Sequence, residues 1–122
     1  MKTFTYESLS VEYAMEQLKK DTVQTFIFKG KITHTNANAI GDDLDTVFDD
    51  SSPNVIVDLS QLEYVNSVGI AVILSLVRRV EDLKGRFSVG GRHKLVETIV
   101  QLLEVSDHVE VYSSLEEAKA RW

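Results

Sequence analysis

From residue 35 onward the chain alternates helical segments with short strand-forming segments, and this alternation constrains the fold more than any other feature. The helical segments have apolar side chains three and four residues apart, and the strand-forming segments are short runs rich in Val, Ile and Phe. Helices are expected behind the capping residues Thr35 and Asn36 as far as about Ser51, from Asn66 to Lys84, from His93 to Val105 and from Leu115 to Trp122; strands are expected at 55–57, 87–89 and 109–111. Strands followed by helices in this way predict right-handed crossovers and a largely parallel sheet.

The first 30 residues follow a different pattern. Every second residue from Val11 to Met15 is apolar, and strand formers fill residues 23–28 after a polar stretch. This pattern predicts an antiparallel hairpin, although Val11, Met15 and Leu18 would also share one face of a helix. With the hairpin, the sequence predicts an α/β fold: a single domain over residues 1–122, with a mixed five-stranded sheet, about four helices and the order ββαβαβαβα.

The charge and cysteine content exclude several classes of function. The 122 residues include 19 acidic and 13 basic side chains, a net charge of −6, and no cysteine. An acidic chain without a basic cluster does not suit nucleic-acid phosphates. The absence of cysteine rules out disulfides and thiolate chemistry. The longest apolar run, Val68 to Val77, is too short to span a bilayer, and no apolar leader follows Met1, so we expect a cytoplasmic protein without membrane insertion.

Two features could suggest a cofactor, and both have a simpler interpretation. Carboxylates suit Mg²⁺ or Ca²⁺, but these lie on or just beyond the polar face of a predicted helix, without a calcium-loop motif, so we interpret them as a solvated face. The residues concerned are Asp42, Asp43, Asp45, Asp49 and Asp50. Gly90 and Gly91 precede a predicted helix but lack the Lys-Ser/Thr of a phosphate loop, which favours a tight turn. The sequence predicts no cofactor and no resident metal.

Catalysis is not expected either. The chain contains no Gly-x-Ser-x-Gly elbow, and no hydroxyl has an evident companion base nearby in the sequence. We therefore expect a binding module rather than an enzyme.

The turn Asn66–Ser67–Val68–Gly69 is the strongest candidate site. It follows a predicted parallel strand and opens the next helix, and loops at the carboxyl ends of such strands usually carry function. The Ser67 hydroxyl would lie at the first helical turn, where free backbone N–H groups and the helix dipole stabilise an anion. The alternative is that Asn66 or Ser67 serves only as the helix N-cap.

The same helix carries more apolar surface than one packed face requires. Ile70, Ile73, Leu74 and Val77 suffice to pack it against the sheet. The remaining apolar side chains, Val68, Val72 and Leu76, are candidates for a partner-facing stripe, unless neighbouring helices cover them.

Four segments together resemble a STAS domain of the anti-sigma factor antagonist family, and the similarity runs from about Val23 to Val111. They are Gly30–Lys31–Ile32, residues 55–60 (VIVDLS), the turn from Asn66 to Ile70, and residues 85–89 (GRFSV). In that family the turn usually reads Asp-Ser-Ser/Thr-Gly, and its first Ser is phosphorylated by a partner that is both anti-sigma factor and serine kinase. That position matches Ser67.

The resemblance implies a switch. The unmodified protein would bind the anti-sigma factor, phosphorylation of Ser67 would release it, and a PP2C-type phosphatase would reverse the modification, so that transcription is regulated indirectly. Partner contacts are expected from Asn66, Val68, Gly69, Val72 and Leu76. Asn66 replaces the usual Asp and Val68 the usual second hydroxyl, so one charge is lost and Ser67 is the only hydroxyl in the turn.

Two other roles remain open for such a domain. One is a structural subunit of a lipid-transport or signalling assembly, in which Ser67 is not phosphorylated. The other is a small-molecule or nucleotide-binding domain that uses the same helix N-terminus.

Overall fold

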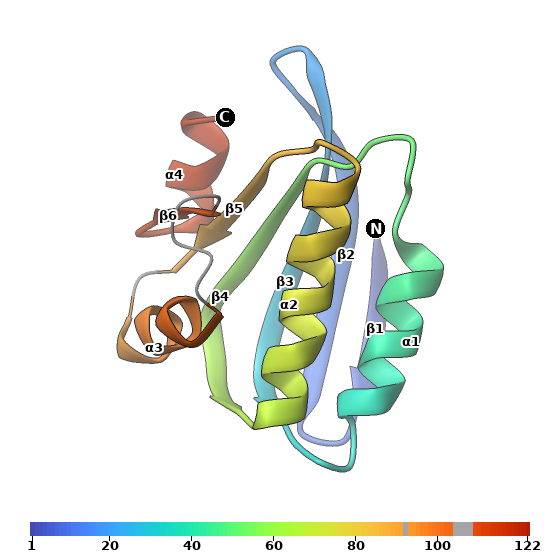
Figure 1. Ribbon diagram of the computed structural model, residues 1–122, viewed down its shortest axis with the longest axis vertical. Coiled ribbons are helices and arrows are strands. Elements are labelled where there is room, and N and C mark those ends of the chain that lie inside the picture. Colours follow the sequence, from blue (N-terminus) through green and yellow to red (C-terminus); the bar gives the residue numbers. More distant parts are fainter. Residues whose placement is uncertain (92, 104–108) are drawn as a thin grey trace.

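A six-stranded mixed sheet forms the centre of the molecule (Figure 1). The computed structural model describes residues 1–91, 93–103 and 109–122. The elements are β1 (Lys2–Tyr6), β2 (Leu9–Leu18), β3 (Asp21–Ile32), α1 (Ala37–Val47), β4 (Val55–Val65), α2 (Ser67–Asp82), β5 (Phe87–Gly90), α3 (Lys94–Leu103), β6 (Val109–Tyr112) and α4 (Leu115–Ala120). The strands lie in the sheet in the order of the sequence.

Strand directions divide the sheet into two parts. β1, β2 and β3 pair antiparallel, whereas β3 to β6 pair parallel. The predicted hairpin and mixed sheet are therefore confirmed, and the alternative helix over residues 11–18 is wrong. The predicted count of five strands is also wrong, because β1 adds a strand at the edge. Its apolar residues, Phe4 and Tyr6, are only partly buried, so its sequence signal is weak.

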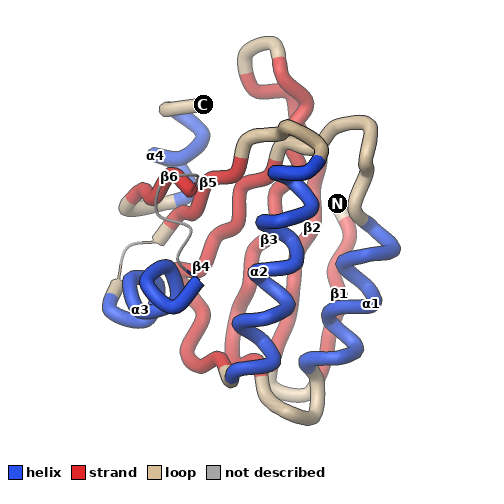
Figure 2. Tube along the Cα trace, in the orientation of Figure 1, coloured by secondary structure: helices blue, strands red, loops and turns tan. Residues whose placement is uncertain are grey.

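Helices cover both faces of the sheet unequally. α1, α2 and α3 pack on one face, where α1 and α2 lie side by side (Figures 1 and 2). This side holds the main core, which includes Phe26, Phe28, Val57 and Ile73. α4 packs on β4, β5 and β6 over a smaller cluster of Val23, Ile56, Ala118 and Trp122 on the opposite face.

A network around Arg86 holds the end of α4. The Arg86 guanidinium donates to both carboxylate oxygens of Glu110, at 2.6 and 2.9 Å, and lies 4.5 Å from the centre of the Trp122 ring. Trp122 in turn donates its indole N–H to Asp21 at 2.9 Å. Under this helix the hydroxyl of Ser88 is fully buried and has no hydrogen-bond partner among the described residues.

Two element boundaries differ from the sequence expectations. β4 continues to Val65 because its second half pairs with β3 as far as Ile32. α1 ends at Val47, earlier than expected, because Phe48 adopts an extended backbone and packs its ring beneath Arg79. Helix α3 confirms the helix expected from His93, while residues 104 and 105 of that expectation lie outside the described residues.

In the part of the chain that the structure describes, no helix has both the length and the apolar content needed to cross a membrane.

Candidate functional site

Ser67 is the first residue of α2, at the edge of the sheet where the parallel strands end. Asn66 fixes this turn, because its side-chain Oδ1 accepts a hydrogen bond from the Gly69 N–H at 2.8 Å and its own N–H donates to the Ile32 carbonyl at 3.1 Å. Asn66 is therefore the N-cap, and Ser67 is not needed for that role. The Ser67 side chain is exposed, and its hydroxyl has no hydrogen-bond partner among the described residues.

Gly69 sets how closely α2 approaches the sheet. A Cβ atom at this position would lie 2.6 Å from the Cγ2 atoms of both Ile32 and Val65, which is too close for carbon atoms. Gly69 is buried, so it shapes the site through packing rather than as a contact surface. The absent side chain brings the helix N-terminus against the ends of β3 and β4.

The apolar stripe on α2 is shorter than expected. Val68 is 43% exposed and Val72 is half-buried, so both remain at the surface. Leu76 is only 6% exposed, and the expectation that it belongs to an exposed stripe is wrong. The physical reason is the neighbouring helix α1, which packs against α2 at this level. Ile73 and Val77 are buried in the core as expected.

A hollow of about 290 Å³ beside Asn66 was not predicted from the sequence. It is lined by Glu7, Ser8, Thr33, His34, Thr35, Tyr64 and Asn66. Tyr64, which is 50% exposed, stands at the end of β4 next to the cap. The only sequence signal for this hollow is the cluster of hydroxyl residues around His34.

Asn36 holds the loops that form this hollow. Its amide nitrogen donates to the carbonyls of Glu7 and Lys31, at 2.7 and 3.0 Å, and its Oδ1 accepts from the Thr33 N–H at 2.9 Å. Asn36 stands at the N-cap position of α1, as expected, but its side chain makes no capping hydrogen bond. The side chain instead joins the β1–β2 turn to the β3–α1 loop.

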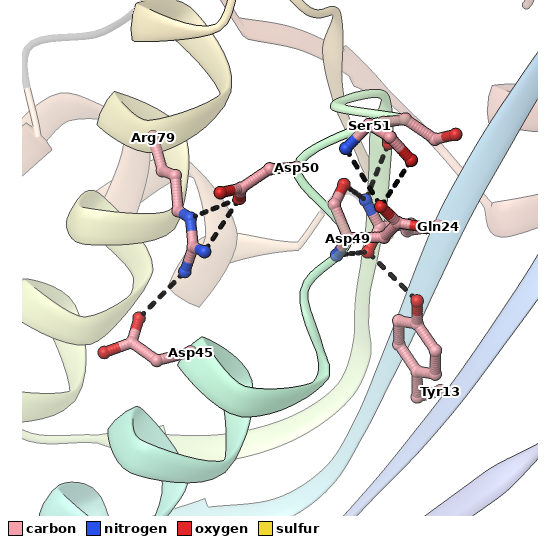
Figure 3. Close-up of polar contacts among 8 residues, drawn as sticks. Tyr13, Gln24, Asp45, Asp49, Asp50, Ser51 and Arg79 are labelled. Atoms are coloured by element: carbon pink, nitrogen blue, oxygen red, sulfur yellow. Dashed lines mark hydrogen bonds and ion pairs between the residues drawn. The ribbon is translucent and has the colours of Figure 1, made fainter.

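The acidic residues of α1 and the following loop have mostly structural partners (Figure 3). Arg79 of α2 pairs with Asp50 at 2.7 Å and with Asp45 at 3.3 Å. Asp49 accepts hydrogen bonds from the backbone and hydroxyl of Ser51, and these lower its pKa. Asp43 accepts from the Tyr6 hydroxyl at 2.6 Å, and burial together with this bond raises the tyrosine pKa.

The buried side-chain amide of Gln24, in β3, holds the backbone of that loop (Figure 3). Its Oε1 accepts from the Tyr13 hydroxyl and the Asp49 N–H, and its Nε2 donates to the carbonyls of Asp49 and Ser52. The carboxylates of Asp45, Asp49 and Asp50 are partly paired, whereas the sequence predicted a solvated face. Over the described residues, no three His, Asp or Glu side chains converge in a way that could hold a metal ion.

The Gly90–Gly91 turn is packed rather than open. Gly91 has a φ of +96°, and a Cβ there would lie 2.5 Å from the Ser60 nitrogen. Its N–H donates to the Tyr112 carbonyl at 3.0 Å. This geometry fits the tight turn that the sequence predicts.

Comparison with known proteins identifies the fold around this site. The family model described as "STAS domain" matches residues 13–118. An anti-sigma factor antagonist from Mycobacterium paratuberculosis has 22% identity and a TM-score of 0.70, with 91% of this chain and 92% of that chain covered. The Bacillus cell fate determinant SpoIIAA in its phosphorylated form has 17% identity and a TM-score of 0.68, with 90% and 98% covered.

The same fold occurs in a different setting. A sulfate transporter family protein from Wolinella succinogenes has 13% identity and a TM-score of 0.66, with 81% of this chain and 83% of that chain covered. No curated protein sequence matches the chain. At these identities the solved structures establish the fold alone.

Proposed function

The chain belongs to the STAS domain family, and on that premise we propose that it is an anti-sigma factor antagonist. In this proposal it is a binding module without catalytic activity. It binds an anti-sigma factor that is also a serine kinase, and it is released when that kinase phosphorylates Ser67. A PP2C-type phosphatase restores the binding form, and transcription is regulated indirectly.

The exposed hydroxyl of Ser67 at the start of α2 is the observation that carries this proposal. Asn66 already caps the helix, so Ser67 can be modified without loss of the cap. A phosphate adds about −1.5 to −2 charges, which the unpaired N–H groups and the dipole at a helix N-terminus stabilise. The fold should therefore tolerate the modification.

The partner surface should not tolerate it. Val68 and Val72 offer apolar surface on the same helix, and a partner packed on them would meet a strongly hydrated dianion at Ser67. A cost of about 3 kcal/mol for desolvation and repulsion lowers affinity more than a hundredfold. Phosphorylation would thus switch off binding with little change of fold.

Two structural neighbours support this interpretation. One is an anti-sigma factor antagonist, and another was solved in a phosphorylated form. At two positions, Asn66 and Val68, the turn departs from the Asp and the second hydroxyl that are usual in the family, and the change at Asn66 alters its electrostatics. Asn66 keeps the cap hydrogen bond without a charge beside Ser67, so the phosphate should be easier to hold than beside Asp.

The decisive experiment is to incubate the protein with candidate GHKL-type kinases and ATP, and then to locate the phosphate by mass spectrometry. We expect phosphate on Ser67 and its removal by a PP2C-type phosphatase. Ser67→Ala should abolish the modification, whereas Ser60→Ala, at an exposed serine of β4, should not. Phosphate elsewhere with Ser67 unmodified would contradict the proposal.

Binding of the unmodified protein tests the second half of the switch. Ser67→Ala should bind the kinase as wild type does, and Ser67→Glu should bind it about a hundredfold more weakly. Ser67→Gln is the matched control, because it has the size of Glu without the charge. Equal affinity of the Glu and Gln variants would show that charge at this position does not control binding.

A structural subunit is the alternative that one observation favours, since the fold is shared with a sulfate transporter family protein. In that role Ser67 would be exposed without being modified. Stable co-purification with a transport complex, unaffected by Ser67→Glu, would favour the structural role over the switch.

A further inference from the structure

Gly41 lies in the middle of α1, where the fold does not require a glycine. Glycine inside a helix is less stable than alanine by about 0.5–1 kcal/mol. The residue lies in regular helix rather than among the glycines with positive φ. A Cβ at this position would lie 3.5 Å from the Cγ2 of Val72, which is an ordinary van der Waals contact. Unlike Gly69, Gly41 is explained neither by its backbone nor by its packing.

The absence of a side chain at Gly41 leaves a groove open between α1 and α2. The groove is lined mainly by apolar residues and ends at Asp45 and Arg79; its other lining residues are Gly41, Leu44, Val72, Ser75 and Leu76. Its volume is about 90 Å³. A dry apolar cavity of about 150 Å³ holds benzene, so this smaller space suits a branched aliphatic side chain rather than an aromatic ring.

The groove lies close to Ser67. α1 and α2 both begin at the edge where the parallel strands end, and they run side by side in the same direction (Figure 1). Val72 follows Ser67 by five residues, a rise of about 7.5 Å along the helix. Val68 lies between them and is 43% exposed, so one partner surface can cover Ser67, Val68 and the groove.

The rim of the groove is negatively charged. No Lys or Arg occurs between Lys31 and Arg78, whereas α1 and the loop after it carry five aspartates. Arg79 pairs with Asp45 and Asp50, but the Asp45 side chain remains 77% exposed. Two carboxylates thus share one guanidinium, and the remaining negative charge favours a cation on the partner.

We propose that the groove receives one branched aliphatic side chain of the anti-sigma factor that binds at Ser67, and that a neighbouring Lys or Arg of the same protein pairs with Asp45. This inference rests on the proposed function, because it assigns a second contact of the same partner. Gly41 is then a specificity residue: it gives up helix stability to leave room for the partner's side chain.

The test uses the full chain and the kinase that phosphorylates Ser67, with affinity measured by calorimetry in the absence of ATP. Gly41→Ala should melt at the same temperature as wild type or higher, because alanine favours the helix, and should bind at least tenfold more weakly. Asn38→Ala is the matched control, since it also improves an exposed position of α1 but does not line the groove. Its affinity should equal that of wild type.

A second variant tests the charge separately from the shape. Asp45→Asn should slow association with the kinase and reduce the dependence of that rate on salt, while Arg79 keeps its pair with Asp50. An unchanged rate and salt dependence would refute the predicted cation on the partner.

The outcomes separate this inference from the proposed function. Wild-type affinity of Gly41→Ala, together with weakened binding of Ser67→Glu, would overturn the groove inference and leave the switch standing. Weakened Gly41→Ala with full binding of Ser67→Glu would overturn the switch and support the groove. A lower melting temperature of Gly41→Ala would show that the groove is closed in solution, and absence of any kinase binding would overturn both proposals.

Discussion

Replacing Asn66 tests the physical basis of the site most directly. Asn66→Ala removes the oxygen that accepts the Gly69 N–H at 2.8 Å, while the backbone hydrogen bond from residue 66 to the Ile32 carbonyl can remain. Loss of an N-cap side chain costs about 1 kcal/mol. For a domain of this length that cost corresponds to a melting temperature about 3–5 °C lower.

Asn66→Asp should have the opposite effect. Asp keeps the acceptor and places a negative charge at the positive end of the α2 dipole, which is worth about 0.3–1 kcal/mol. The order of stability at pH 7 should therefore be Asp, then Asn, then Ala. Because the dipole lowers the folded-state pKa of that Asp, its advantage should be present above about pH 4 and disappear as the pH falls further.

Urea unfolding followed by far-UV circular dichroism, at pH 7 and at pH 2.5, measures both effects. Asn38→Ala serves as the control for a change of helix propensity at an exposed position that makes no cap. If Asn66→Ala unfolds with the wild-type free energy, the hydrogen bond to Gly69 does not hold the turn. If Asn66→Asp is less stable than wild type at pH 7, the dipole argument for a phosphate at Ser67 fails with it.

The remaining predictions concern a buried hydroxyl, two apolar side chains of α2 and the ion pair at Arg86. Ser88→Ala should raise the free energy of unfolding by about 1 kcal/mol, because the buried hydroxyl has no partner among the described residues; a lower free energy of unfolding in urea would show that this hydroxyl is hydrogen-bonded. Ile73→Ala should lower the free energy of unfolding by about 2–5 kcal/mol. Val68→Asp, at a 43% exposed position, should weaken kinase binding and change the free energy of unfolding by less than about 0.5 kcal/mol. If the Val68→Asp variant is unfolded, Val68 belongs to the core. Arg86 holds the pKa of Glu110 below its ordinary value, so this pair stabilises the fold above about pH 4.5 and loses its contribution as the pH falls. Glu110→Gln should therefore make the free energy of unfolding fall less steeply with decreasing pH below about pH 4.5. An unchanged pH dependence would refute the pairing.

Local signals explain what could be predicted from the sequence. Helix α2 was expected from Asn66 to Lys84 and spans Ser67–Asp82, because a capping Asn and a terminating Gly mark its ends within a few residues. The run at residues 55–57 likewise predicted a buried strand correctly. Strand β1 was missed, since an edge strand with two partly buried apolar residues gives little periodicity.

Contacts between distant segments explain what could not be predicted. Leu76 shares the helical face of Val68 and Val72, and only the position of α1 decides that Leu76 is covered while Val68 is not. Asn36 looks like a cap in the sequence, but it hydrogen-bonds the carbonyl of Glu7, 29 residues away. The groove at Gly41 likewise depends on how two helices meet, which periodicity within either helix does not specify.

The position of Trp122 makes its intrinsic fluorescence a reporter of unfolding that should not respond to binding at Ser67. It is the only tryptophan, and it packs beneath Arg86 and is hydrogen-bonded to Asp21, at the end of the sheet where β3 begins. Ser67 lies at the opposite end, beyond the C-terminal ends of the parallel strands. Intrinsic tryptophan emission should therefore shift to longer wavelength when α4 detaches or the domain unfolds, and stay constant while a tryptophan-free partner binds at Ser67. A spectral change during such a titration would reveal that the sheet transmits strain from one end to the other.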